Sequence, residues 1–152
     1  TIFKGNIMKY TMHEMLKKAG NGQTKDKKIK LLREFDSPEL RSLVKSSYDP
    51  NIVWLLPEGD VPYNRKDYKL GDGSHKFLFT EISTLYHFVK GGNDSLKKPK
   101  REQMFIELLE SLHESEAELL ILAKDKGLYK KYKLSDNVIR EAFNWNSEYR
   151  KV

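Results

Sequence analysis

Apolar residues recur at helical spacing between Lys100 and Lys126, and this stretch organises the predicted fold. Its first half places apolar side chains on one face of a 3.6-residue period, at Met104, Phe105, Leu108, Leu109 and Leu112. Ser115 followed by Glu118 fits a capping box, in which each side chain binds a free backbone N–H at a helix start. We therefore predict two helices that meet at His113-Glu114. The second is apolar nearly all round, so we expect it to be buried, with the rest of the chain packed around it.

Start and stop signals predict further helices at about residues 11–19, 24–34, 37–48 and 77–89, and a last helix that begins at residue 135. Thr11 and Glu14 form a second capping box. Pro38 suits the first helical position, and that helix should stop before Pro50, because the residue before a proline avoids helical backbone. The helix over 77–89 is expected to share one apolar face made of Ile82, Leu85, Tyr86 and Val89.

From Pro50 to Gly73 the helical spacing is lost. The short apolar run from Ile52 to Leu56 is compatible with either a strand or a helical turn. A connection this long is expected to be anchored or functional. The predicted fold is therefore mainly α, a single compact domain of about six short helices with one long ordered loop that contains prolines and glycines. Residues 1–9 and 144–152 are predicted to be terminal extensions.

Length and composition agree with one globular domain. The chain has 152 residues, which is enough to close a single core, and its aromatic share of 11% argues against disorder. It contains no cysteine, which excludes disulfides and thiolate metal sites. No apolar run approaches the roughly 18 residues of a membrane-spanning helix. These features are typical of a cytoplasmic protein.

The net charge of +6 is unevenly distributed. Residues 102–122 contain glutamates but no lysine or arginine, whereas the segments before and after them are basic. The glutamates are expected at exposed helical positions, as a solvated acidic face. The acidic and basic segments either complement each other within the fold or leave a basic surface for a polyanion.

Several segments carry a family resemblance, above all residues 101–113 (REQMFIELLESLH), with residues 55–59 (LLPEG) in the first half. Between Met8 and Phe143 the chain resembles a small uncharacterised protein family of tailed, mostly marine and cyanobacterial, bacteriophages. The resemblance is absent from residues 1–7, 69–75 and 144–152. It implies a compact single domain of bacteriophage source, acting in the cytoplasm of the infected bacterial host or in the virion. It implies no catalytic residue and no binding site.

No residue pattern indicates an enzyme. The histidines lack the spacing that puts two metal ligands on one helix face; they are His13, His75, His87 and His113. The glycines of residues 71–73 lack the Lys-Ser/Thr pair that closes a phosphate-binding loop. We therefore expect no catalytic residue, no metal and no cofactor.

Cations interleaved with tyrosines are the strongest functional signal. Lysine and arginine neutralise phosphates, and tyrosine faces stack on unpaired bases, so the combination favours single-stranded nucleic acid, either DNA or RNA. The candidate nucleic-acid-binding residues are Lys25, Lys27, Lys28, Lys30, Arg65, Lys66, Lys98, Lys100, Arg101, Tyr129, Lys130, Lys131, Tyr132 and Lys133. We predict a basic phage accessory module that binds by phosphate contacts and base stacking.

The alternative is an adaptor or inhibitor that binds a host or phage protein, including one of the virion. Its contact residues would be Trp54, Pro57 and Tyr63, with the acidic helix face as a second surface. Basic residues gathered on one face would favour nucleic acid. An exposed apolar patch around Trp54 and Tyr63 would favour a protein partner.

Overall fold

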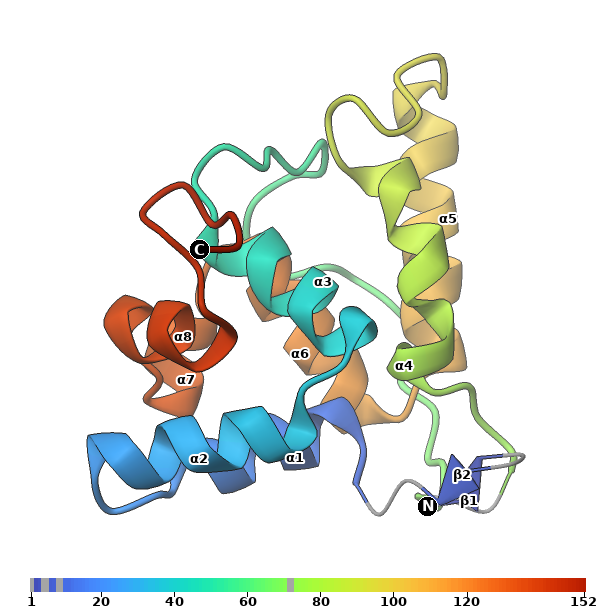
Figure 1. The fold of residues 1–152 in the computed structure, drawn as a ribbon. Coiled ribbons are helices and arrows are strands. Elements are labelled where there is room, and N and C mark those ends of the chain that lie inside the picture. Colours follow the sequence, from blue (N-terminus) through green and yellow to red (C-terminus); the bar gives the residue numbers. More distant parts are fainter. Residues whose placement is uncertain (1, 4–5, 8–9, 71–72) are drawn as a thin grey trace.

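Helices are the main elements of this computed structural model, which describes residues 2–3, 6–7, 10–70 and 73–152 (Figure 1). The elements are β1 Ile2–Phe3, β2 Asn6–Ile7, α1 Met12–Gly20, α2 Lys25–Phe35, α3 Pro38–Tyr48, α4 Leu78–Glu81, the 3₁₀ helix η1 Ile82–Phe88, α5 Lys98–Ser111, α6 Glu114–Lys124, α7 Leu128–Tyr132 and α8 Asp136–Phe143. β1 and β2 pair as a short antiparallel hairpin. The mainly α single domain is confirmed. Part of the extension predicted over 1–9 lies outside the described residues, as do residues 71–72.

Helix α6 lies at the centre of the domain, as its apolar composition predicts. It packs against α1, α3, α5 and α7, and Leu119, Leu120 and Ala123 are completely buried. The break between α5 and α6 falls at Leu112 and His113, whose backbones are extended. The prediction of two helices that meet at this point is therefore confirmed.

The predicted capping box at Ser115 is wrong. Helix α6 begins two residues earlier than predicted, at Glu114, and His113 is its N-cap. The imidazole Nδ1 of His113 accepts the backbone N–H of Ser115 at 3.2 Å. A ring nitrogen thus takes the place of the expected hydroxyl, because the extended backbone of His113 brings its side chain over the free N–H groups of the first turn.

The other helix starts follow the local signals in the sequence. Thr11 and Glu14 form a complete capping box at α1, and the hydroxyl of Thr24 caps α2. Ser37 caps α3, with Pro38 at its first position. Each of these caps satisfies a backbone donor that the helix itself leaves free.

Residues 77–89 form α4 and the 3₁₀ helix η1 rather than one α-helix. A 3₁₀ helix has three residues per turn, so Leu85 and Phe88 both point into the core, with Ile82 partly buried beside them. Tyr86 is 50% exposed. The predicted apolar face that included Tyr86 is therefore wrong, because it assumed a period of 3.6.

The loop after α3 is ordered by extended pairing with the end of η1. Trp54 and Val89 form an antiparallel bridge, in which the N–H of Leu55 donates to the Phe88 carbonyl at 2.8 Å. The indole N–H of Trp54 donates to the Ser46 carbonyl at 2.9 Å. The run from Ile52 to Leu56 is thus a short strand-like segment, not a helical turn.

The segment 144–152 folds back onto the domain, although it was predicted to be an extension. Trp145 and Tyr149 are buried, and the Tyr149 hydroxyl donates to the Asp136 carboxylate at the start of α8. Asn144 ends α8 in the left-handed conformation, with φ 56°, which asparagine tolerates better than most residues. In the described part of the chain, no helix is long and apolar enough to cross a membrane.

Candidate functional site

Helices α1 and α2 pass the C-terminal end of α7 at one edge of the domain (Figure 1). Lysines of all three segments lie there. The Nζ of Lys28 on α2 donates to the Lys133 carbonyl at 2.7 Å. The backbones of α1 and α7 also touch, because a Cβ added at Gly20 would lie 1.8 Å from the Tyr132 carbonyl oxygen. We call the lysines at this edge, together with the adjacent exposed Lys130 of α7, the basic corner: Lys17, Lys28, Lys130, Lys131 and Lys133.

The side chain of His13 reports how closely these charges approach one another. Its Nδ1 lies 2.7 Å from the hydroxyl of Tyr132, and the ring is half-buried between α1 and α7. Burial lowers the pKa of His13, and the positive charges of Lys17 and Lys131 lower it further, whereas the carboxylates of Glu14 and Glu118 oppose this shift. Lysines 114 positions apart in the sequence therefore act on the same imidazole.

The lysines of the basic corner are not held in ion pairs with described acidic residues. Among the described residues, none of its five lysines forms an ion pair, whereas neighbouring Lys25 pairs with Glu141 at 3.6 Å. Lys27 and Lys30 project from the outer face of α2, where they are exposed. The α2 and α7 segments of the sequence prediction thus converge.

Two predicted site residues are buried. Arg101 is 6% exposed, and its guanidinium donates to the carbonyls of His87, Asn93 and Leu96 at 3.0, 3.3 and 2.8 Å. Tyr132 is 5% exposed and holds His13. Arg101 fastens the chain between η1 and α5, and Tyr132 fastens α7 to α1, so neither presents a surface to nucleic acid.

The remaining predicted cations lie elsewhere. Arg65 contacts Glu114 and also Glu118, at 3.5 Å, so its charge is matched by the acidic face of α6. Lys66 is exposed beside it in the loop. Lys98 and Lys100 are exposed at the start of α5, at the end of the molecule far from α2 and α7 (Figure 1). The structure therefore divides the predicted basic set among three places.

Replacing Arg101 by Met should lower the free energy of unfolding by about 1–3 kcal/mol, because three buried carbonyls lose a charged donor. The affinity for nucleic acid should stay at the wild-type value. Thermal denaturation measures the first effect and fluorescence anisotropy with a labelled oligonucleotide the second. Lys100→Met, on the exposed neighbour, is the control and should change neither. If the variant lost binding at unchanged stability, Arg101 would contact nucleic acid directly and the prediction would be wrong.

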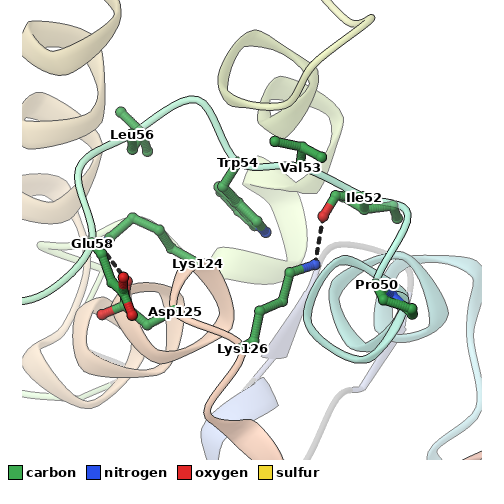
Figure 2. A pocket seen from close by; sticks show the side chains of 9 residues that line it. All are labelled: Pro50, Ile52, Val53, Trp54, Leu56, Glu58, Lys124, Asp125 and Lys126. Carbon is green, nitrogen blue, oxygen red and sulfur yellow. Dashed lines mark hydrogen bonds and ion pairs between the residues drawn. The ribbon is translucent and has the colours of Figure 1, made fainter.

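The three residues of the alternative, protein-binding interpretation do not form an exposed apolar patch. Trp54 is 8% exposed and forms one wall of a pocket beneath the loop (Figure 2). Pro57 is exposed, and Tyr63 is partly buried, with an enclosed hydroxyl that has no hydrogen-bond partner among the described residues. Trp54 therefore presents no exposed anchor to a partner.

Two lysines at the end of α6 hold this loop in place. The Nζ of Lys126 donates to the carbonyls of Ser46, Asp49 and Ile52 at 2.9, 2.9 and 2.6 Å. An ammonium group has three donors, so all are used. Lys126 also takes the left-handed conformation after α6, with φ 61°. Burial lowers the pKa of Lys126, partly opposed by Asp49.

Lys124 is fully committed in the same way. Its Nζ donates to the carbonyls of Pro57 and Gly59 at 2.7 and 3.0 Å and to Asp125 at 2.6 Å. The pocket in Figure 2 therefore contains two lysines, but both serve to anchor the loop. In the sequence, Lys124-Asp125-Lys126 has the pattern of an ordinary solvated charge run, and no local signal marks it as buried.

Glu116 is the buried carboxylate that sequence reasoning missed. It is completely buried and accepts the N–H groups of Leu78 at 3.0 Å and Met12 at 3.3 Å, so it joins the starts of α4 and α1 to α6. Burial raises the pKa of Glu116 to about 7, against the opposing effect of these hydrogen bonds. The expectation that every glutamate of this region is exposed is wrong at this position. Helical phase marks it, since Glu116 shares a face with Leu119, Leu120 and Ala123.

Two of the histidines that are distant in sequence lie together. The rings of His75 and His113 have centroids 5.6 Å apart, and His75 also contacts Phe77 edge-on at 4.9 Å. In the ranges that the structure describes, no group of three or more His, Asp or Glu side chains is placed to hold a metal ion. The histidine pair thus belongs to an aromatic cluster at the start of α4.

Comparison with known proteins defines a family. No similar protein was found among curated proteins, and no similar fold among solved structures. Residues 15–130 match the profile of DUF6433, which is described as a family of unknown function. The matched region runs from within α1 to α7 and includes most of the basic corner. Since it spans well over half of the chain, the protein belongs to the DUF6433 family.

Proposed function

We propose that this protein binds nucleic acid through the basic corner, mainly by contacts between lysines and phosphates. The contact between Lys28 and Lys133 carries the proposal, because it joins two basic segments that are 105 positions apart into one surface. Lys17 and Lys131 extend that surface across α1 and α7. Phosphates along a strand need several cations within reach of each other, and the basic corner supplies them.

The kind of cation favours recognition that does not depend on sequence. Lysine is a flexible point charge that neutralises a phosphate but does not form the bidentate pairs by which arginine reads guanine. The basic corner consists entirely of lysine. The resemblance to bacteriophage proteins suggests a phage source, with phage or host nucleic acid in the infected cell as the ligand.

Changing Lys130 and Lys131 together to Ala should weaken the binding of DNA and RNA of any sequence and flatten its salt dependence. Each phosphate contact on a single strand contributes about −0.7 to the log–log slope of affinity against salt concentration. Losing two contacts should therefore reduce the slope by about 1.4. Fluorescence anisotropy titrations between about 50 and 200 mM salt measure both quantities.

Lys98 and Lys100 provide the matched control. Changing both to Ala removes the same charge from a distant exposed site, so affinity and slope should remain near those of the wild-type protein. Equal losses in the two double variants would show that net charge matters rather than the basic corner. An absence of any binding at about 50 mM salt, where phosphate contacts are strong, would end the proposal.

A further inference from the structure

A pocket lined by tyrosines lies beside the basic corner. It has a volume of about 640 Å³ and is formed where the end of α3, helix α7, the start of α8 and the C-terminal segment meet. Its walls include Tyr48, Pro50, Tyr129, Ser135, Asp136 and Tyr149. Segments from four parts of the chain thus build one open cavity, and three of its eight lining residues are tyrosines.

Most polar groups around this tyrosine pocket already have protein partners. The Tyr48 hydroxyl donates to the Leu134 carbonyl at 2.7 Å, and the Tyr149 hydroxyl donates to Asp136. The Lys126 ammonium is held by three carbonyls. The surfaces left for a ligand are therefore ring faces and edges. Asp136 adds carboxylate lone pairs beyond those used by Tyr149 and Arg140.

Tyr129 is the exposed wall of the pocket. Tyr129 is 57% exposed, and among the described residues no other aromatic ring lies against its ring. On α7, Tyr129 and Lys131 are two residues apart, about 200° around the helix axis, so they occupy different flanks. Lys131 faces His13 and α1, whereas Tyr129 faces the end of α3.

Successive residues at the end of α7 connect the pocket with the basic corner. The Lys133 carbonyl accepts Lys28 from the basic corner, and the next carbonyl, that of Leu134, accepts Tyr48 from the pocket. Consecutive Cα atoms are about 3.8 Å apart. The pocket and the basic corner therefore lie on opposite flanks of α7 and meet at its C-terminal end, so a strand with its phosphates on the basic corner would pass around that end to place a base in the pocket.

We propose that the tyrosine pocket holds one unpaired nucleobase, stacked on Tyr129, of a strand whose phosphates lie on the basic corner. A base is flat, with apolar faces and donor groups on its edge, which matches ring walls and a carboxylate. This inference rests on the proposed function and adds to it a reason for preferring single strands. Stacking on an aromatic face is independent of base identity, so the preference is for strandedness rather than sequence.

The experiment compares one labelled DNA strand of about 15 nucleotides, a length near the footprint of one binding domain, with its duplex. Tyr129→Ala should lower the affinity for the single strand about tenfold and leave the affinity for the duplex and the salt slope unchanged. Tyr129→Phe should bind both like the wild-type protein, because it retains the ring. Tyr86→Ala is the matched control, since Tyr86 is 50% exposed on η1, which packs on α3, α4 and α5. Circular dichroism melts establish that each variant is folded.

The outcomes separate the two proposals. If Tyr129→Ala weakens the binding of single strand and duplex equally, or weakens the binding of neither, the pocket holds no base and this inference is wrong. The basic corner would still stand if Lys130→Ala with Lys131→Ala weakens both. If the wild-type protein binds neither strand nor duplex, both proposals fall.

Discussion

Leu120→Ala should lower the free energy of unfolding by about 2–5 kcal/mol. Leu120 is completely buried in α6, the helix against which α1, α3, α5 and α7 pack. Truncation removes apolar contacts and leaves a cavity that the surrounding helices fill only in part. For a domain of this size each kcal/mol corresponds to about 2–4 °C in the melting temperature, so the change is readily measured by thermal denaturation.

Leu70→Ala is the control for this measurement. The chemical change is the same, but Leu70 is 40% exposed in the long loop. The free energy of unfolding of the Leu70→Ala variant should therefore stay within about 0.5 kcal/mol of the wild-type value. A Leu120→Ala variant that melts within about a degree of wild type would remove α6 from the centre of the fold.

Glu116→Gln should change how stability depends on pH. Burial raises the pKa of Glu116 to about 7 in the folded protein, whereas an unfolded glutamate has a pKa near 4.3. The folded state thus favours the protonated carboxyl. The contribution of Glu116 to the free energy of unfolding is fully present below the unfolded pKa and is lost as pH rises through about 7. Since one pKa unit corresponds to 1.36 kcal/mol, the wild-type protein should lose about 3 kcal/mol from this group between pH 4 and 8.

Glutamine is neutral at every pH, so the difference between the two proteins isolates this group. Near pH 5 the variant should be about 1 kcal/mol less stable, because its amide nitrogen cannot accept one of the two backbone N–H groups. By pH 8 the difference should have moved about 3 kcal/mol in favour of the variant. Burial lowers the pKa of His13, so its contribution to stability changes with pH in the direction opposite to that of Glu116. This contribution is the same in the wild-type protein and the variant, so it cancels in the comparison. Urea titrations at several pH values measure the difference, and a constant value across this range would contradict the prediction.

Helix starts were well predicted because their causes are local. The caps at Thr11 and Ser37 depend on residues three positions away, and the apolar period of α5 and α6 depends on positions within one helix. The break at His113 was placed correctly even though the capping residue was wrong, because the interruption of the apolar pattern marks it. The 3₁₀ geometry of η1 was missed, since a period of three cannot be separated from 3.6 over seven residues.

The candidate site was predicted only in part. The lysines of α2 and α7 were correctly singled out as basic segments, but their meeting at Lys28 and Lys133 was not foreseeable. Arg101 has the same sequence context as an exposed lysine, yet it is buried by its bonds to carbonyls before α5. Glu116 could have been recognised from its helical phase, because it shares the buried face of α6.

The sequence by itself determined most of the helical segments, the starts of α1 to α3 and the burial of α6, because these properties follow from caps and periodicity within about four residues. It did not predict the short helix α7, the 3₁₀ geometry of η1 or the cap of α6. Only the tertiary structure decided which charged side chains are buried and bonded to other parts of the protein. Lys124, Lys126, Arg101 and Glu116 bind backbone groups of other elements, and such partners come from parts of the chain that no local pattern relates. The physical reason is that a buried charge requires hydrogen-bond partners, and packing alone supplies them.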